Sequence, residues 1–90
     1  MKIWTTPREA LDAVNEAGKT GRFFVTPHAN QEAKECSASR YDIQEALRTA
    51  CEAKHQPEHD RWRVVGKDLD GDDLTVVVAF DAGVVVVTVF

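Results

Sequence analysis

Long apolar runs are missing from this sequence, and so is any excess of positive charge. No apolar stretch reaches the ~20 residues that a membrane helix needs, and the valine-rich run at 84–89 is far too short. The N-terminus lacks the charged-then-apolar pattern of a secretory signal, so we expect a cytoplasmic protein with no membrane partner. The net charge of −4 counts against strong nonspecific binding of nucleic acid, although a local basic stripe is compatible with it.

Cysteine is also scarce. The two cysteines, Cys36 and Cys51, fall in segments whose pattern predicts helices, so we expect two buried thiols and no disulfide. Cys51, His55 and His59 have the spacing of metal ligands, but a proline interrupts them and no fourth ligand follows. The acidic run 68–73 resembles a calcium loop without its final glutamate. With no glycine-rich phosphate loop and no histidine-activated nucleophile either, we predict no metal and no cofactor.

Three helix starts are present in a chain of ninety residues, which is enough for one domain with one modest core. The first predicted helix spans 6–18, opens with a capping threonine before a proline, and ends at a glycine. Thr26 and Pro27 repeat that start, which places His28 in the first turn of a second helix. A third helix begins at Ser39, and its apolar stripe continues to Cys51.

The remaining segments alternate in a way that predicts strands. A short edge strand covers 22–25, a polar loop covers 55–60, and three strands within 61–90 form an antiparallel meander. The order α-β-α-α-β-β-β predicts an α+β fold: a small antiparallel sheet of about four strands with helices packed on one face. The third helix is the expected cover. Residues 1–21 form a leading helix and linker, and 22–90 form the core of a single domain.

Three motifs in order resemble the domain of unknown function 4258 family. Residues 24–29 are similar to its strand–T–x–H–A opening, 42–47 to its D–[IV]–x–x–A–L helix, and 63–89 to its strand pattern. The resemblance covers roughly 22–90, with an added leading helix. The family's order of elements is similar to that of the RelE-like toxins, which are small ribonucleases of toxin–antitoxin pairs. Those proteins cover one sheet face with helices and meet RNA on the other.

The resemblance implies a metal-independent endoribonuclease in which His28 transfers a proton, with RNA as substrate and an antitoxin as partner. Histidine titrates in the range that such a role requires. Cleavage also needs cations for the phosphate and a hydrogen-bond donor. The residues that we predict for these tasks are Arg61, Arg63 and Lys67, which share one face of a strand, together with Thr88 as a catalytic donor and Tyr41 as a substrate-binding donor.

A second interpretation of these residues stays open. His28 also fits a helix-start residue that bonds a neighbouring backbone carbonyl or pairs with Glu32, and the basic stripe also fits a solvated face balanced by nearby aspartates. Many family members carry arginines four and eight residues after the histidine, where this chain has Glu32 and Cys36. A carboxylate at such a position repels phosphate. The alternative function is therefore a catalytically inactive module of the same fold that binds a protein partner.

Overall fold

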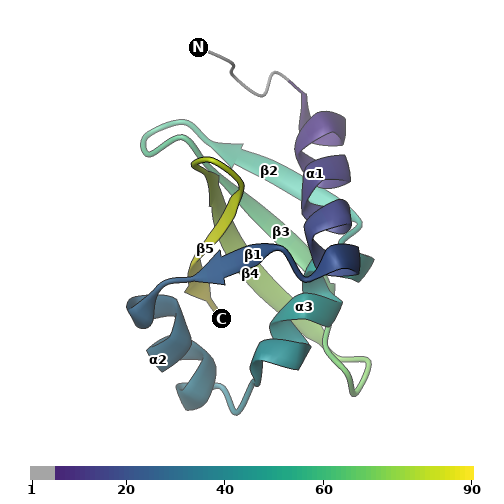
Figure 1. Ribbon diagram of the computed structural model, residues 1–90, viewed down its shortest axis with the longest axis vertical. Helices are drawn as coiled ribbons and strands as arrows, with labels where there is room; N and C mark the ends of the chain where they lie inside the picture. The colour runs from purple at the N-terminus through teal and green to yellow at the C-terminus, as the bar shows by residue number, and fades with distance from the viewer. Residues whose placement is uncertain (1–5) are drawn as a thin grey trace.

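The computed structural model describes residues 6–90, which form three helices and five strands around one core (Figure 1). The strands make a single sheet in the order β1-β5-β4-β3-β2. The first five residues of the predicted leading segment lie outside the described part of the chain. The elements follow one another as α1 (Pro7–Thr20), β1 (Phe23–Val25), α2 (Pro27–Glu35), α3 (Arg40–Thr49), β2 (Glu52–Gln56), β3 (Arg61–Lys67), β4 (Asp73–Phe80) and β5 (Val84–Val89).

The predicted α+β fold and the antiparallel meander of β3, β4 and β5 are confirmed, and β1 lies at a sheet edge as expected. Two features of the sheet differ from the prediction. The sheet has five strands because Glu52–Gln56, partly predicted as a loop, pairs antiparallel with β3. It is also mixed, because β1 runs parallel to β5. As an edge strand, β2 carries mostly polar side chains, which hides it from an apolar pattern.

α1 is longer than predicted. It continues through Gly18 to Thr20 and ends at Gly21, whose φ of 75° lies in the left-handed region and whose N–H donates to the Ala17 carbonyl. Gly18 marks a helix contact instead of a stop, since a Cβ there would overlap the backbone of Arg48. α1 and α3 therefore touch backbone to backbone.

α3 is shorter than predicted and ends at Thr49. Ala50 is extended, and the Cys51 N–H donates to the Val65 carbonyl at 3.1 Å, which begins the approach of β2 to β3. Both cysteines are free and exposed, Cys36 at the end of α2 and Cys51 between α3 and β2. The prediction of two buried thiols was wrong because both helices end before the position at which the thiol would face the core.

One hydrophobic core lies between the three helices and a single face of the sheet. Alternate residues of β3 point to it, as the sequence predicts: Trp62, Val64 and Gly66 are buried there, while Arg63 and Lys67 are exposed on the opposite face. α3 covers β3 and β4, which confirms its expected place. Most of the buried residues that the helices contribute to this core are alanines. The full set is Ala10, Val14, Ala17, Ala29, Ala33, Ile43, Ala46 and Leu47. None of the helices within 6–90 combines the length and the apolar composition that crossing a membrane requires.

Asp42 joins the start of α3 to the turn between β3 and β4. Its Oδ2 accepts hydrogen bonds from the Ser39 N–H (2.8 Å) and the Ser39 hydroxyl (3.1 Å), and its Oδ1 accepts one from the Leu69 N–H (3.0 Å). Hydrogen bonds from the backbone of Ser39, and then of Leu69, hold the pKa of this carboxyl below its ordinary value of 3.8.

We expect Asp42→Asn to lower the melting temperature at neutral pH, and the difference from the natural protein to disappear in acid. The ionised carboxylate is the form that accepts these bonds. Its contribution is fully present above pH 3.8 and is lost as the pH falls through the lower pKa of the folded state. Thermal unfolding of both proteins between about pH 7 and about pH 2 measures this effect. A difference that persists undiminished at the acid end would contradict the assignment.

Candidate functional site

The face of the sheet that the helices leave free carries a cluster of cations. Lys54 on β2 lies directly opposite Arg63 on β3, and Arg61 lies two residues before Arg63 on the same strand face. Like charges directly opposite each other destabilise a sheet. Within residues 6–90, none of these three side chains forms an ion pair with a carboxylate. The basic cluster of Lys54, Arg61 and Arg63 is therefore a candidate anion-binding site.

Lys67 shares this face but differs in its electrostatics. Its Nζ lies 2.5 Å from the Asp73 Oδ1 on the directly opposite residue of β4. The hydrogen bond and negative charge of Asp73 raise the pKa of Lys67. The alternative interpretation, in which nearby aspartates balance the basic side chains of a solvated face, therefore describes Lys67 but not Arg61 and Arg63. Lys54 takes its place in the cluster, and sequence reasoning missed it because β2 was not predicted.

Arg63 on β3 lies between Lys54 on β2 and Val77 on β4. With Lys54, Glu52 and Val65 it lines a groove of about 510 Å³ at the β2–β3 pair. Its guanidinium carbon also lies 5.2 Å from the centre of the Phe90 ring. Thr88 belongs to the same cross-strand row, because Val77 on β4 pairs with Arg63 on one side and with Thr88 on the other. The structure therefore brings Arg61, Arg63 and Thr88 onto one surface, as the predicted site requires.

His28 lies in the first turn of α2, where Thr26 caps the helix by accepting from the Ala29 N–H at 3.1 Å. The imidazole is exposed, and its Nε2 lies 3.4 Å from the Glu32 Oε2. The other oxygen of Glu32 accepts from the Val89 N–H at 3.2 Å. Glu32 therefore joins α2 to the free edge of β5, and it holds His28 beside the end of that strand. The pairing with Glu32 that the sequence suggested is present.

His28 is not among the residues that line the Arg63 groove. β5 and β4 lie between α2, which packs along β5, and β3. Tyr41 also lies outside this groove, since it is an exposed residue at the start of α3 and α3 belongs to the helix layer. The structure thus divides the predicted site into three parts: the basic cluster with Thr88, the His28–Glu32 pair at the edge of β5, and Tyr41 on the helix side.

The backbone bond of Glu32 has a consequence for stability. We expect Glu32→Ala to reduce the free energy of unfolding by about 1–2 kcal/mol, because the half-buried Val89 N–H loses its acceptor. Glu32→Gln is the matched control, since its amide oxygen can still accept from Val89. Urea unfolding of the three proteins measures the difference. Equal losses in both variants would show that the bond to Val89 contributes nothing.

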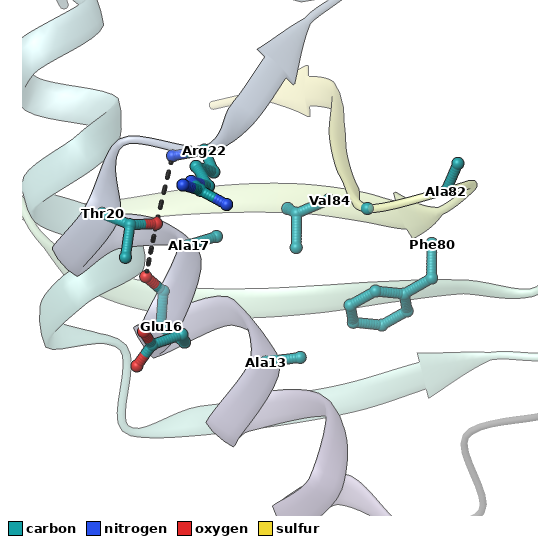
Figure 2. A pocket seen from close by; sticks show the side chains of 9 residues that line it. Ala13, Glu16, Ala17, Thr20, Arg22, Phe80, Ala82 and Val84 are labelled. Atoms are coloured by element: carbon teal, nitrogen blue, oxygen red, sulfur yellow. Dashed lines mark hydrogen bonds between the residues drawn. The ribbon is translucent and has the colours of Figure 1, made fainter.

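A second groove of about 460 Å³ lies between α1 and the β4–β5 hairpin (Figure 2). Its walls are mainly apolar, with Ala13 and Ala17 from α1 facing Val84 from β5. The Thr20 hydroxyl donates to the Glu16 carbonyl at 3.0 Å and accepts from the Arg22 N–H at 3.3 Å, so it stabilises the turn into β1. The groove offers an apolar surface, and the hydroxyl of Thr20 in its wall is already hydrogen-bonded to the backbone.

Cys51, His55 and His59 have the spacing of metal ligands in the sequence, and in the structure His55 makes other contacts. Within residues 6–90, no three His, Cys, Asp or Glu side chains are arranged to hold a metal ion. The His55 Nε2 lies 2.9 Å from the Asp60 Oδ1, and its ring centre lies 4.7 Å from that of Trp62. His55 therefore packs at the end of the β2–β3 pair.

These features define a small α+β protein with one helix-covered and one free, partly cationic sheet face. The family model described as Domain of unknown function (DUF4258) matches residues 25–90, and the chain belongs to this family. α1 lies entirely before the matched region, in agreement with its prediction as an added helix. No curated protein and no solved structure matches the chain.

Proposed function

We propose that this protein is a toxin-type ribonuclease of RelE-like architecture that binds RNA on the free face of its sheet. The observation that carries the proposal is the placement of Lys54 opposite Arg63 with Arg61 beside them, and none of the three has a carboxylate partner in the described part of the chain. Three such cations on one face of a chain with a net charge of −4 form a local site for phosphate. The helices on the other face leave this surface open, as in the proposed architecture.

Cleavage without a metal proceeds by attack of the ribose 2′-hydroxyl on the neighbouring phosphate. This attack forms a 2′,3′-cyclic phosphate and breaks the bond to the 5′-oxygen, which leaves as a hydroxyl after taking a proton from water. In this proposal, His28 takes the 2′-hydroxyl proton, and Glu32 orients the imidazole through the 3.4 Å contact. The Thr88 hydroxyl donates to the phosphate, and the basic cluster holds neighbouring phosphates of the same strand. An RNA strand that crosses β4 and β5 connects these groups. The cytoplasm, where messenger RNA and an antitoxin partner occur, is the proposed location.

The direct test of this proposal is the binding of RNA by Arg63→Ala, with Arg8→Ala as the control. Arg8 is exposed on α1, away from the sheet, so both variants change the net charge equally. We expect Arg63→Ala to weaken binding of a short single-stranded RNA about five- to tenfold and to reduce the slope of log K against log salt by about 0.7. Fluorescence anisotropy with 2′-O-methyl RNA, which resists this cleavage, measures both. Equal affinities of the two variants would refute the site.

A second candidate function has its own support. Phe24 and Phe90 are 60% and 52% exposed, and both lie on the free face, next to valines of β5. Exposed aromatic side chains of this kind are typical of protein interfaces. A catalytically inactive module that binds a protein partner through this face therefore remains the alternative. It predicts no RNA binding by the natural protein and no cleavage of purified RNA.

A further inference from the structure

The backbone of Phe90 pairs with β4 beside the basic cluster. Its N–H donates to the Thr75 carbonyl and its own carbonyl accepts from the Thr75 N–H, both at 2.9 Å. These paired bonds place Phe90 directly opposite Thr75 on β4. About half of the residue is nevertheless exposed, at 52%. Two backbone hydrogen bonds thus place an exposed aromatic residue on the free face of the sheet.

The ring and the basic cluster share one shallow surface. The β4 residues between β5 and β3 on this face are Thr75 and Val77, whose side chains are short. Val77 is 5% exposed although it lies outside the main core, so its neighbours on this face cover it. Arg63 reaches across β4 to lie 5.2 Å from the centre of the Phe90 ring. Between the Phe90 ring and the cations of β3, β4 therefore presents only the short side chains of Thr75 and Val77.

We propose that Phe90 stacks on an unpaired nucleobase, which makes single-stranded RNA the substrate class of this face. The inference rests on the proposed RNA-binding function. The base occupies the position over the ring that the Arg63 guanidinium takes in the free protein. Arg63 is then released to bind the adjoining phosphate beside Lys54, so a contact within the protein is exchanged for two contacts with RNA.

Single-stranded RNA follows from the geometry of stacking. In a duplex the faces of the bases are covered by their neighbours, and only unpaired bases expose a face to an aromatic ring. The cations beside Phe90 do not make this distinction, because both single strands and duplexes carry phosphates. The basic cluster therefore supplies affinity, and Phe90 supplies the preference for unpaired RNA.

The test compares Phe90→Leu and Phe90→Tyr by fluorescence anisotropy, with a 12-nucleotide unstructured 2′-O-methyl RNA and with inorganic polyphosphate. Leucine keeps an apolar side chain but removes the ring, whereas tyrosine keeps the ring and is the matched control. We expect Phe90→Leu to weaken RNA binding about fivefold or more, while Phe90→Tyr stays within about twofold. Polyphosphate binding is expected to be unchanged in Phe90→Leu and weakened in Arg63→Ala.

The outcomes separate the two proposals. If Arg63→Ala weakens RNA binding but Phe90→Leu does not, the stacking role is refuted while the RNA-binding face stands. If Phe90→Leu weakens RNA and polyphosphate equally, the ring only positions Arg63, and stacking is again refuted. If the natural protein binds no RNA, the proposed function fails and the inference fails with it. Circular dichroism melts of each variant establish that the fold is retained.

Discussion

Replacing Gly66 with alanine is expected to reduce the free energy of unfolding by about 3 kcal/mol or more. Gly66 lies on β3 at the point where α3 crosses the sheet. A Cβ at this position would lie within 2.7 Å of the Ala46 carbonyl carbon and closer still to the carbonyl oxygen. Both sides of this contact are backbone, so no side chain can rotate away. The helix must move off the sheet, and the core between them must open.

The matched control is Gly71→Ala in the β3–β4 turn. Gly71 has φ of +85°, but a Cβ there meets nothing within 4 Å. Its substitution is expected to cost only the roughly 1 kcal/mol of a left-handed alanine. Urea unfolding of both variants and the natural protein measures the two effects. Similar losses in the two variants would show that α3 moves aside easily, and that the close contact with Ala46 is not a constraint.

The sequence predicts the beginnings of these helices better than their ends. Each start carries its own local signal, with Thr6, Thr26 and Ser39 as caps that accept hydrogen bonds from backbone N–H groups within the first turn. The ends depend on packing instead. Gly18 looks like a stop in the sequence, but it is the place where α1 meets α3. A contact of this kind involves residues about thirty positions apart, so no local pattern reports it.

In the sheet, too, pairings between neighbours in sequence were predictable and pairings between distant segments were not. The meander of β3, β4 and β5 is formed by neighbours in sequence and was predictable from alternation and turns. The parallel pairing of β1 with β5 joins residues 23–25 to residues 84–86, about sixty positions later, and β2 carries too few apolar residues to be recognised. In the candidate site, alternation placed Arg61 and Arg63 on one face. Lys54 was missed with β2, and the Glu32–Val89 bond spans 57 positions.

A second large effect is expected for His28→Ala, which tests cleavage separately from binding. If His28 transfers the proton, its removal should lower the rate of RNA cleavage about 100-fold or more, whereas affinity for uncleavable RNA stays unchanged. Induction of the natural protein in a bacterial host should arrest growth with loss of messenger RNA, and His28→Ala should relieve the arrest. His59→Ala is the matched control, because His59 is an exposed histidine in the β2–β3 turn.

The position of His28 makes this experiment decisive for the chemistry. Its imidazole lies on α2 beside the end of β5, with β4 between that strand and the β3 residues Arg61 and Arg63, so in the proposed mechanism binding and proton transfer involve different parts of the molecule. Variants of the two parts should therefore separate, with Arg63→Ala acting on affinity and His28→Ala acting on rate. Unchanged cleavage in His28→Ala would remove the histidine from the mechanism and leave the RNA-binding face intact. Normal growth with every variant, together with no cleavage of purified RNA, would favour the inactive binding module.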